Sequence, residues 1–457
     1  MDVMELLNWF MGLGSIVVLP ALVFVFGMVL GTKPSKALMS ALTVGIGFVG
    51  LNLVISLLGE SLGPAAQQMV ENLGLELTTI DVGWPAAAAI SYGTALGGLA
   101  IPIGLGLNFV LILFGLTKTL NVDLWNIWHA AFISSLIYAL TGDMTLSIAA
   151  TCVYIMMILL FGDILGGVIN RFYGFPNITF PHGTAIPGFI FALPFNWLFD
   201  RIPVVKNWKA DPETIQNKFG IFGQSTVIGA IIGLGIGLAA GYDAAGLGQL
   251  AVKMAAVMML MPRMVALLME GLTPISEAAN AFVQKRFPDR ELYIGMDAAL
   301  SVGHPAVLSS SLLLVPITIL LAVVLPGNTT LPFGDLATIP FLVCLMAAVF
   351  NGNIIRTVIA GTFYMVTILY ITSWVAPLVT QAAIASNFDL QGNTTITAMA
   401  EGGLWTTWMY VGLAELFSMT GILSIGVVVL AGLVYVNKIL PGRKNKQQHG
   451  QDTAAVK

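Results

Sequence analysis

The chain has 457 residues, of which 57% are hydrophobic and 9% are charged. Soluble globular proteins carry about 25% charged residues, so this composition excludes a soluble enzyme and predicts an all-α polytopic membrane protein. The net charge is −4, and no block of basic residues occurs before the C-terminal tail, which excludes a nucleic-acid-binding protein.

The first apolar stretch, residues 9–31, predicts a retained membrane helix rather than a cleaved signal peptide. Residues 1–32 contain Asp2 and Glu5 but no Lys or Arg, whereas a signal peptide begins with a basic region and has a shorter apolar core. We therefore expect the first membrane span here.

Basic residues mark the cytoplasmic ends of membrane spans, and in this chain they alternate with loops that contain none. Lys33, Lys36 and Lys118 predict inside connections, whereas the loop at 59–79 and the turn at 141–144 predict outside ones. The alternation continues to the C-terminus. It predicts about eleven transmembrane helices, with the N-terminus outside and the C-terminus inside.

Stretches about 210 residues apart resemble each other and indicate an internal repeat. Leu57–Pro64 matches Leu267–Pro274 best, and three shorter matches follow in the same order. Each repeat would hold an odd number of spans, so the second would lie upside down relative to the first, as in many transporters. We expect a first repeat at 1–165, a cytoplasmic amphipathic linker at 166–219, a second repeat at 220–375, an external segment and last transmembrane helix at 376–437, and a cytoplasmic tail at 438–457.

Residues 81–95 and 297–311 are too short and too rich in Gly and Pro for ordinary spans, yet too apolar for exposed loops. We interpret each as a re-entrant hairpin, because irregular backbone at membrane depth is tolerated where it lines a cavity or is buried in protein. The alternative is that a Gly-x-Pro-Ala sequence merely kinks a packed helix in each half.

An ionisable or polar side chain at membrane depth is costly, so each one is a candidate for function. Such residues lie beside the two hairpins, near residue 125, after residue 180 and at the start of a span in the second repeat. We expect substrate contacts from Asp123, Asn126, His129, His182, Asp297, His304 and Asp335. The alternatives are that the two aspartates that open spans cap helices, that His129 is a satisfied core histidine and that His304 caps a turn.

The two cysteines, Cys152 and Cys344, each lie in an apolar run. They form neither a disulfide framework nor a Cys-x-x-Cys metal motif. We therefore expect two small buried side chains, no metal and no other cofactor.

Several unusual runs resemble the enzyme IIC components of bacterial galactitol phosphotransferase systems. The runs comprise residues 45–50, 81–85, 121–129, 181–184, 255–263 and 331–339. The Trp-Asn-Ile-Trp-His run at 125–129 and the Pro-Phe-Gly-Asp-Leu-Ala-Thr run at 332–338 are the most specific. The resemblance implies the fold of the ascorbate enzyme IIC: two inverted five-helix repeats plus a last helix, with a core domain that moves against a dimerising scaffold.

The resemblance also implies a mechanism. A homodimer in the bacterial cytoplasmic (inner) membrane would bind a sugar alcohol outside and carry it inward in an elevator-type movement; galactitol is the leading substrate, with pentitols and other hexitols open. A phosphocysteine on a separate enzyme IIB, which works with enzyme IIA, would then phosphorylate the polyol. This chain would carry no phosphoryl group. It would position the hydroxyl, with His129 or His182 as proton acceptor and with Trp84 and Thr184 as further contacts.

The segment from Asn170 to Phe219 combines five Lys or Arg with an apolar patch at 195–199, so we expect it to lie at the cytoplasmic surface and to help dock enzyme IIB. Two other classes of function stay open. An ion-coupled secondary polyol transporter would use the same inverted repeat and buried aspartates. An intramembrane enzyme acting on lipid would need a paired nucleophile and base, which the sequence does not show.

Overall fold

The computed structural model describes residues 15–72, 77–121, 123–208, 210–286, 292–332, 334–388, 390 and 393–440. Within these ranges the chain is helical apart from short strands and connections. Five helical segments are long and apolar enough to cross a membrane: Met144–Tyr173, Ala244–Met261, Pro305–Val324, Ile354–Ala385 and Trp405–Ile439. The chain is thus an all-helical membrane protein, as its composition predicts, and the count of about eleven spans stays a prediction.

The elements of the first half alternate pairs of helices with single short strands. They are α2 (Ser15–Val29), α3 (Pro34–Asn72), β1 (Thr79–Asp81), α4 (Trp84–Gly93), α5 (Ala95–Leu113), β2 (Thr119–Asn121), a 3-10 turn (Leu124–Ile127), α6 (Trp128–Thr141), α7 (Met144–Tyr173) and β3 (Ile178–Thr179). A linker region follows, with α8 (Ala185–Phe199), α9 (Pro203–Lys206), α10 (Pro212–Phe219) and a 3-10 turn (Gly220–Gly223).

The second half has its elements in the same order. They are α11 (Ser225–Ala239), α12 (Ala244–Arg286), β4 (Tyr293–Gly295), α13 (Ala299–Val302), α14 (Pro305–Val324), β5 (Thr330–Leu331), a 3-10 turn (Leu336–Thr338), α15 (Ile339–Val349), α16 (Ile354–Ala385) and β6 (Thr395–Thr397). After β6 come α17 (Met399–Gly402), α18 (Trp405–Val434) and a π-helical turn (Tyr435–Ile439).

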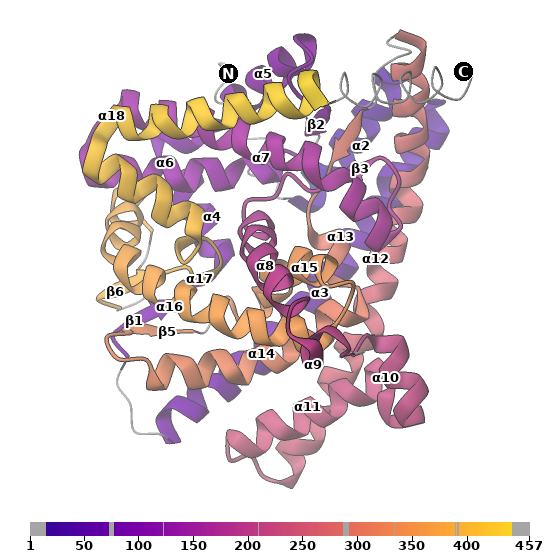
Figure 1. Cartoon of the computed structure of the whole chain (residues 1–457), viewed down its shortest axis with the longest axis vertical. Helices are drawn as coiled ribbons and strands as arrows, with labels where there is room; N and C mark the ends of the chain where they lie inside the picture. The colour runs from indigo at the N-terminus through magenta and orange to yellow at the C-terminus, as the bar shows by residue number, and fades with distance from the viewer. Residues whose placement is uncertain are drawn as a thin grey trace.

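Two small parallel sheets join the halves. In the first sheet β1 lies between β5 and β6, and Thr79 pairs with both Thr330 and Thr395. In the second sheet β4 lies between β2 and β3, and Ile294 pairs with Ile178. Each central strand therefore comes from one half of the chain and both its neighbours come from the other. In Figure 1 the first sheet lies at the left, whereas β2 and β3 lie toward the upper right.

Two buried carboxylates tie together the segments that leave the first sheet, and we call Asp81 and Asp335 the amide clamp. The Asp81 carboxylate accepts hydrogen bonds from the backbone amides of Gly83 at 3.2 Å, Met399 at 3.0 Å and Asp335 at 2.8 Å. It therefore connects the ends of β1, β5 and β6, because one of these amides follows each strand.

Asp335 completes the amide clamp from the other side. Its carboxylate accepts hydrogen bonds from the backbone amides of Trp84 at 2.8 Å and Ala400 at 2.7 Å. The segments meet backbone to backbone, since a Cβ added at Gly83 would lie only 3.0 Å from the carbonyl carbon of Gly334. Gly83 also has a φ of +80°, which favours glycine. The clamp thus fixes the start of both α4 and α17.

The helices form two packed groups. In one group α3 runs along α12, while α2 packs on α3 and α11 packs on α12. Small residues permit these contacts, because a Cβ at Gly271 would lie 2.7 Å from the backbone nitrogen of Val44. In the other group α7 packs on α6 and α18, α8 on α15, and α14 on α16. Figure 1 shows α12 along the right side and α11 at the bottom, whereas α6 and α18 lie at the upper left.

Both segments that the sequence predicts as re-entrant hairpins contain a short helix followed by a longer one. Residues 81–95 hold α4 and the start of α5, and residues 297–311 hold α13 and the first part of α14. Thr94 separates the first pair, and its side chain caps α5 by accepting a hydrogen bond from the amide of Gly97 at 3.2 Å. The re-entrant interpretation of both segments stays a prediction.

The C-terminal region departs from a simple last span. α18 is broken at Ser418, whose backbone has a φ of 50° and a ψ of −132°, and its two arms turn sharply on each other in Figure 1. A Cβ at Gly421 would collide with the carbonyl oxygen of Leu413, so glycine is needed at the turn. α16 also continues to Ala385, past the sequence-based boundary at 375.

Candidate functional site

Four ionisable side chains meet beyond the carboxyl ends of the strands, and we call His129, His182, Asp297 and Glu401 the imidazole site. His182 follows β3, Asp297 follows β4, and Glu401 is on α17, which follows β6. His129 is the second residue of α6 and comes after β2 and a 3-10 turn. The two sheets thus bring together residues from four separate segments, two from each half of the chain.

Glu401 is fully buried at the centre of this site. Its Oε2 atom lies 2.9 Å from His129 Nδ1 and accepts a hydrogen bond from Thr184 Oγ1 at 3.1 Å. Its Oε1 atom accepts a longer hydrogen bond, 3.4 Å, from Tyr154 Oη. Thr407 Oγ1 donates to the Glu401 carbonyl oxygen at 2.5 Å. Both the carboxylate and the backbone of Glu401 are therefore held in place.

His182 occupies a similar position beside a second carboxylate. Its Nε2 atom lies 3.5 Å from Asp297 Oδ1, which also accepts a hydrogen bond from the amide of Ala299 at 2.7 Å. The His129 and His182 rings are in edge contact, with centroids 4.6 Å apart, and Phe341 stacks on His182 at 5.8 Å. Each histidine of the first half thus faces a carboxylate of the second half.

One nitrogen of each imidazole has no partner. His129 Nε2 and His182 Nδ1 are buried and form no hydrogen bond within the protein. Buried polar atoms in proteins are almost always paired, and leaving one unpaired costs about 1–3 kcal/mol. Two such atoms on adjoining rings are suited to a ligand hydroxyl, which can both donate and accept.

Gly183 permits the close contact between the two histidines. A Cβ added there would lie 2.6 Å from His129 Cγ and would collide with Tyr154 Oη. The loop that carries His182 can therefore approach His129 only because residue 183 has no side chain.

The structure places two of the predicted contact residues, Asp335 and Trp84, at the amide clamp. Both Asp335 oxygens accept hydrogen bonds from backbone amides, one of them the amide of Trp84, and the Trp84 side chain is half-buried. Asp335 and His129 both bind α17, through Ala400 and Glu401 respectively. The substrate contacts of Asp335 and Trp84 stay predictions. Asp335 is the N-cap residue of the 3-10 turn Leu336–Thr338, but its side chain makes no capping hydrogen bond to that turn and accepts instead from the amides of two other segments.

Asn126 and Asp123 are buried next to the imidazole site. Asn126 Nδ2 donates to Asn121 Oδ1 at 3.2 Å and lies 3.5 Å from the carbonyl oxygen of Met296, the residue before Asp297, while Asn126 Oδ1 is unpaired. Asp123 precedes it in the same turn, and its carbonyl accepts from the Asn126 amide. Asn126 therefore offers a further free acceptor in this region.

His304 has a different environment. It is the N-cap of α14, and its Nδ1 accepts a hydrogen bond from the amide of Ala306 at 3.2 Å. Its ring contacts Phe172 and Tyr173, with centroids 4.5 Å and 5.6 Å away. This is the turn-capping alternative, and the predicted substrate contact stays a prediction.

Sequence reasoning missed Glu401, which the predicted boundaries place in an external segment. A signal was present, because Glu401 interrupts an otherwise apolar run at 398–405 just after a Thr-Ile-Thr strand. That arrangement resembles His182, which also follows a short strand that ends in threonine. Among the described residues, no group of three or more His, Cys, Asp or Glu side chains could hold a metal ion.

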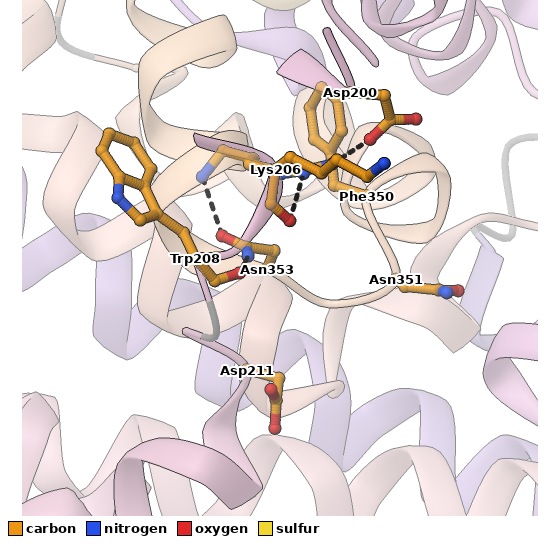
Figure 2. A pocket seen from close by; sticks show the side chains of 8 residues that line it. Asp200, Lys206, Trp208, Asp211, Phe350, Asn351 and Asn353 are labelled. Carbon is orange, nitrogen blue, oxygen red and sulfur yellow. Dashed lines mark hydrogen bonds and ion pairs between the residues drawn. The ribbon is translucent and has the colours of Figure 1, made fainter. Parts of the chain in front are cut away.

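A cavity of about 520 Å³ lies between the linker and the start of α16. Arg356 is buried there; its Nη1 pairs with Asp200 Oδ1 at 3.0 Å, and its Nη2 donates to the carbonyl oxygens of Val205 and Lys206, each at 3.2 Å. Figure 2 shows Lys206 and Asn353 facing this cavity. These contacts attach the linker to the second half.

A helical membrane protein that encloses a polar site between broken helices from two halves has the architecture of a permease. A family model for the sugar-specific permease component of phosphotransferase (PTS) systems matches residues 9–393. The "PTS system galactitol-specific EIIC component" of Escherichia coli strain K12 is 39% identical over 429 residues, which cover 94% of this chain and 95% of that protein.

A "Putative permease IIC component" of the same strain is 36% identical over 431 residues, which cover 93% of this chain and 96% of that protein. The chain therefore belongs to the family of sugar-specific permease components of phosphotransferase systems.

Proposed function

We propose that this permease carries a sugar alcohol, galactitol first among the candidates, into the cell and presents it to a separate enzyme IIB for phosphorylation. The relatives named above support this substrate class, because one of them is a galactitol-specific component that matches nearly the whole chain. Enzyme IIA and enzyme IIB are the partners that this function requires. The membrane is the bacterial cytoplasmic membrane, in keeping with the family and with the apolar helices.

The polyol binds at the imidazole site. The observation that carries this assignment is the pair of unpaired buried nitrogen atoms, His129 Nε2 and His182 Nδ1. Each of these nitrogen atoms lies opposite the nitrogen that faces a carboxylate, so both can accept a hydrogen bond from a polyol hydroxyl, and Asn126 Oδ1 adds a third acceptor. Asp297, 3.5 Å from His182 Nε2, would orient His182, and Thr184 would help to orient His129 by donating to Glu401 Oε2.

The two halves form an inverted repeat. Three observations support this proposal. The two halves have the same order of elements, the long helices α3 and α12 have similar lengths of 39 and 43 residues, and the two sheets exchange strands between the halves. The strand order is β5-β1-β6 in the first sheet and β2-β4-β3 in the second. Exchanging each strand for its counterpart in the other half (β1 with β4, β2 with β5 and β3 with β6) turns the first order into the second. Strand exchange of this kind fixes the ligand site where the halves meet.

The N-terminus lies outside and the C-terminus inside. The charge pattern supports this orientation. The loops before β1, β5 and β6 contain no basic residue, whereas Lys118 precedes β2, Arg290 precedes β4, and Arg171 lies in the last turn of α7, just before β3. Parallel strands enter a sheet from the same side, so each sheet agrees with the pattern. The group of α2, α3, α11 and α12 would be the dimerising scaffold in an elevator-type movement.

The linker contributes to docking of enzyme IIB. Lys206 is exposed beside the cavity of Figure 2, and Arg356 holds that part of the linker on the second half. Lys209 lies outside the described residues. Reversing Lys206 and Lys209 to Glu should slow polyol phosphorylation at limiting enzyme IIB without weakening polyol binding. Lys36→Glu, another exposed residue predicted to be cytoplasmic, is the control, and an unchanged rate in the double variant would remove the linker from the docking surface.

Uptake of a panel of labelled polyols by membrane vesicles tests the function. We expect galactitol to accumulate as its phosphate only when the soluble phosphotransfer proteins are present, and dissipation of ion gradients should have no effect. His129→Ala should raise the polyol Kd at least about tenfold, because a buried hydrogen-bond partner is lost. Polyol uptake that occurs without the soluble phosphotransfer proteins and stops when the ion gradient is dissipated would favour the ion-coupled transporter instead.

A further inference from the structure

We propose that Glu401 is a positioning residue that holds His129 with its proton on Nδ1, so that Nε2 is free to accept the proton of the polyol hydroxyl during phosphoryl transfer. This inference rests on the proposed function and assigns a role to a residue that the sequence reasoning did not identify.

The hydrogen bonds of Glu401 determine which nitrogen of His129 carries the proton. The carboxylate is fully buried and accepts from Thr184 Oγ1 and Tyr154 Oη, so it acts as an acceptor toward two of its three neighbours. An ionised carboxylate has acceptor sites only. When Glu401 is ionised, His129 Nδ1, 2.9 Å from Oε2, donates to it, and neutral His129 then has its lone pair on Nε2.

The free nitrogen lies where a hydroxyl could reach it. His129 Nε2 is buried and has no partner, and its ring adjoins His182, whose Nδ1 is also unpaired. In the transfer step the polyol O–H bond breaks and its proton moves to His129 Nε2. The hydroxyl oxygen forms a bond to phosphorus, the phosphorus–sulfur bond of the enzyme IIB phosphocysteine breaks, and its electron pair leaves with the sulfur as a thiolate.

Glu401 would also stabilise the product of that proton transfer. His129 becomes an imidazolium, and the buried carboxylate 2.9 Å from Nδ1 compensates its charge. A carboxylate that orients a histidine and stabilises its charged form without taking the proton is a recurrent arrangement in acyl-transfer enzymes. The orientation needs a rigid support, and the amide clamp supplies it by binding the amides of Met399 and Ala400 just before Glu401.

Glu401 lies in the second half of the chain and His129 in the first, so their contact joins the two halves at the site. His182 and Asp297 make the corresponding contact at a longer distance, 3.5 Å against 2.9 Å. The shorter contact, with its two additional hydroxyl donors, points to His129 rather than His182 as the proton acceptor.

The test combines a spectroscopic and a kinetic measurement on the full-length protein. The chain contains four histidines, so ¹⁵N-histidine labelling and NMR in lipid can resolve each ring, with His129→Asn to assign the signal. We expect wild-type His129 to carry its proton on Nδ1, and Glu401→Gln to shift its tautomer population toward Nε2–H. Once the signal is assigned, the tautomer is read from the wild-type spectrum alone, and a protonated Nε2 with a bare Nδ1 would overturn the proposal by itself.

The kinetic arm measures polyol phosphorylation at saturating polyol and enzyme IIB, together with polyol affinity by calorimetry. Glu401→Gln should lower the rate by about 100-fold or more, the usual contribution of general-base catalysis, while the polyol Kd changes less than about tenfold. Glu401→Asp, which keeps the charge, should restore part of the rate. Glu415 is an exposed acid on α18, and Glu415→Gln should change neither the phosphorylation rate nor the polyol Kd.

An unchanged rate in Glu401→Gln, or equal losses of affinity and rate, would show a structural role only and overturn the proposal. Failure of the wild-type protein to bind or phosphorylate any polyol would instead contradict the proposed function. The NMR result does not depend on polyol, so the two failures are distinguishable.

Discussion

The amide clamp and the imidazole site are both buried and both contain two carboxylates, but they differ in whether their hydrogen bonds are complete. In the amide clamp, five backbone amides and the hydroxyl of Thr338 donate to Asp81 and Asp335. In the imidazole site, His129 Nε2 and His182 Nδ1 have no partner. The carboxylates of the amide clamp are therefore satisfied within the protein, whereas the imidazole site has two nitrogen atoms available to hydrogen-bond a ligand.

This difference shows why burial alone is a poor guide to function. A sequence rule that selects ionisable residues at membrane depth selects Asp335 and His129 equally, because both are costly to bury. The structure separates them by their partners: backbone amides satisfy one, and the other retains a free nitrogen. The amide clamp holds α17, which carries Glu401, so it supports the imidazole site.

The largest expected effect concerns the sides of the membrane that the two sheets face. In a background with Cys152 and Cys344 replaced by Ala, single cysteines at Thr78 and Thr329 should react with an impermeant thiol reagent only from outside. Cysteines at Lys118 and Asn177 should react only from inside, because the chain enters the second sheet from the cytoplasm. Labelling of Thr78 and Lys118 from one side would contradict the inverted repeat.

A large effect on ligand binding is expected from Gly183→Ala. The new methyl group would overlap Tyr154 Oη and the His129 ring, so His129 must move or the loop must withdraw. Overpacking of this kind costs about 1–3 kcal/mol, which corresponds to a rise in polyol Kd of roughly tenfold or more in calorimetry. Gly167→Ala, at a position with open space, is the control. Normal affinity in Gly183→Ala would place the polyol away from the two histidines.

The smallest effect is expected at the amide clamp and should appear as stability rather than affinity. In Asp335→Asn a side-chain NH₂ would face a backbone amide of Trp84 or Ala400, which leaves a buried donor unpaired at about 1–3 kcal/mol. We expect the melting temperature of the purified protein to fall by a few degrees while polyol affinity of the folded fraction is kept.

Asp243→Asn is the matched control for the clamp, because Asp243 also accepts a hydrogen bond from a backbone amide but is exposed. It should change the melting temperature less than Asp335→Asn does. A tenfold loss of affinity in Asp335→Asn at an unchanged melting temperature would instead place Asp335 among the polyol ligands.

Composition and long apolar runs were enough to predict an all-helical membrane protein, because that conclusion needs no knowledge of how the helices pack. Its specific motifs, such as the run that ends in His129, also identified the phosphotransferase family. These properties follow from residues that are near one another in the chain.

Which buried polar groups lie together could not be read from the sequence, because it depends on how distant segments fold onto one another. Glu401 is 272 residues from His129 in sequence, and the two lie 2.9 Å apart because strands from both halves enter common sheets and end at a common site. No periodicity or motif encodes that distance. Whether a buried nitrogen or oxygen atom has a hydrogen-bond partner likewise depends on groups from distant segments. The unpaired Nε2 of His129 and the paired carboxylate oxygens of Asp335 can therefore be distinguished only in the folded structure.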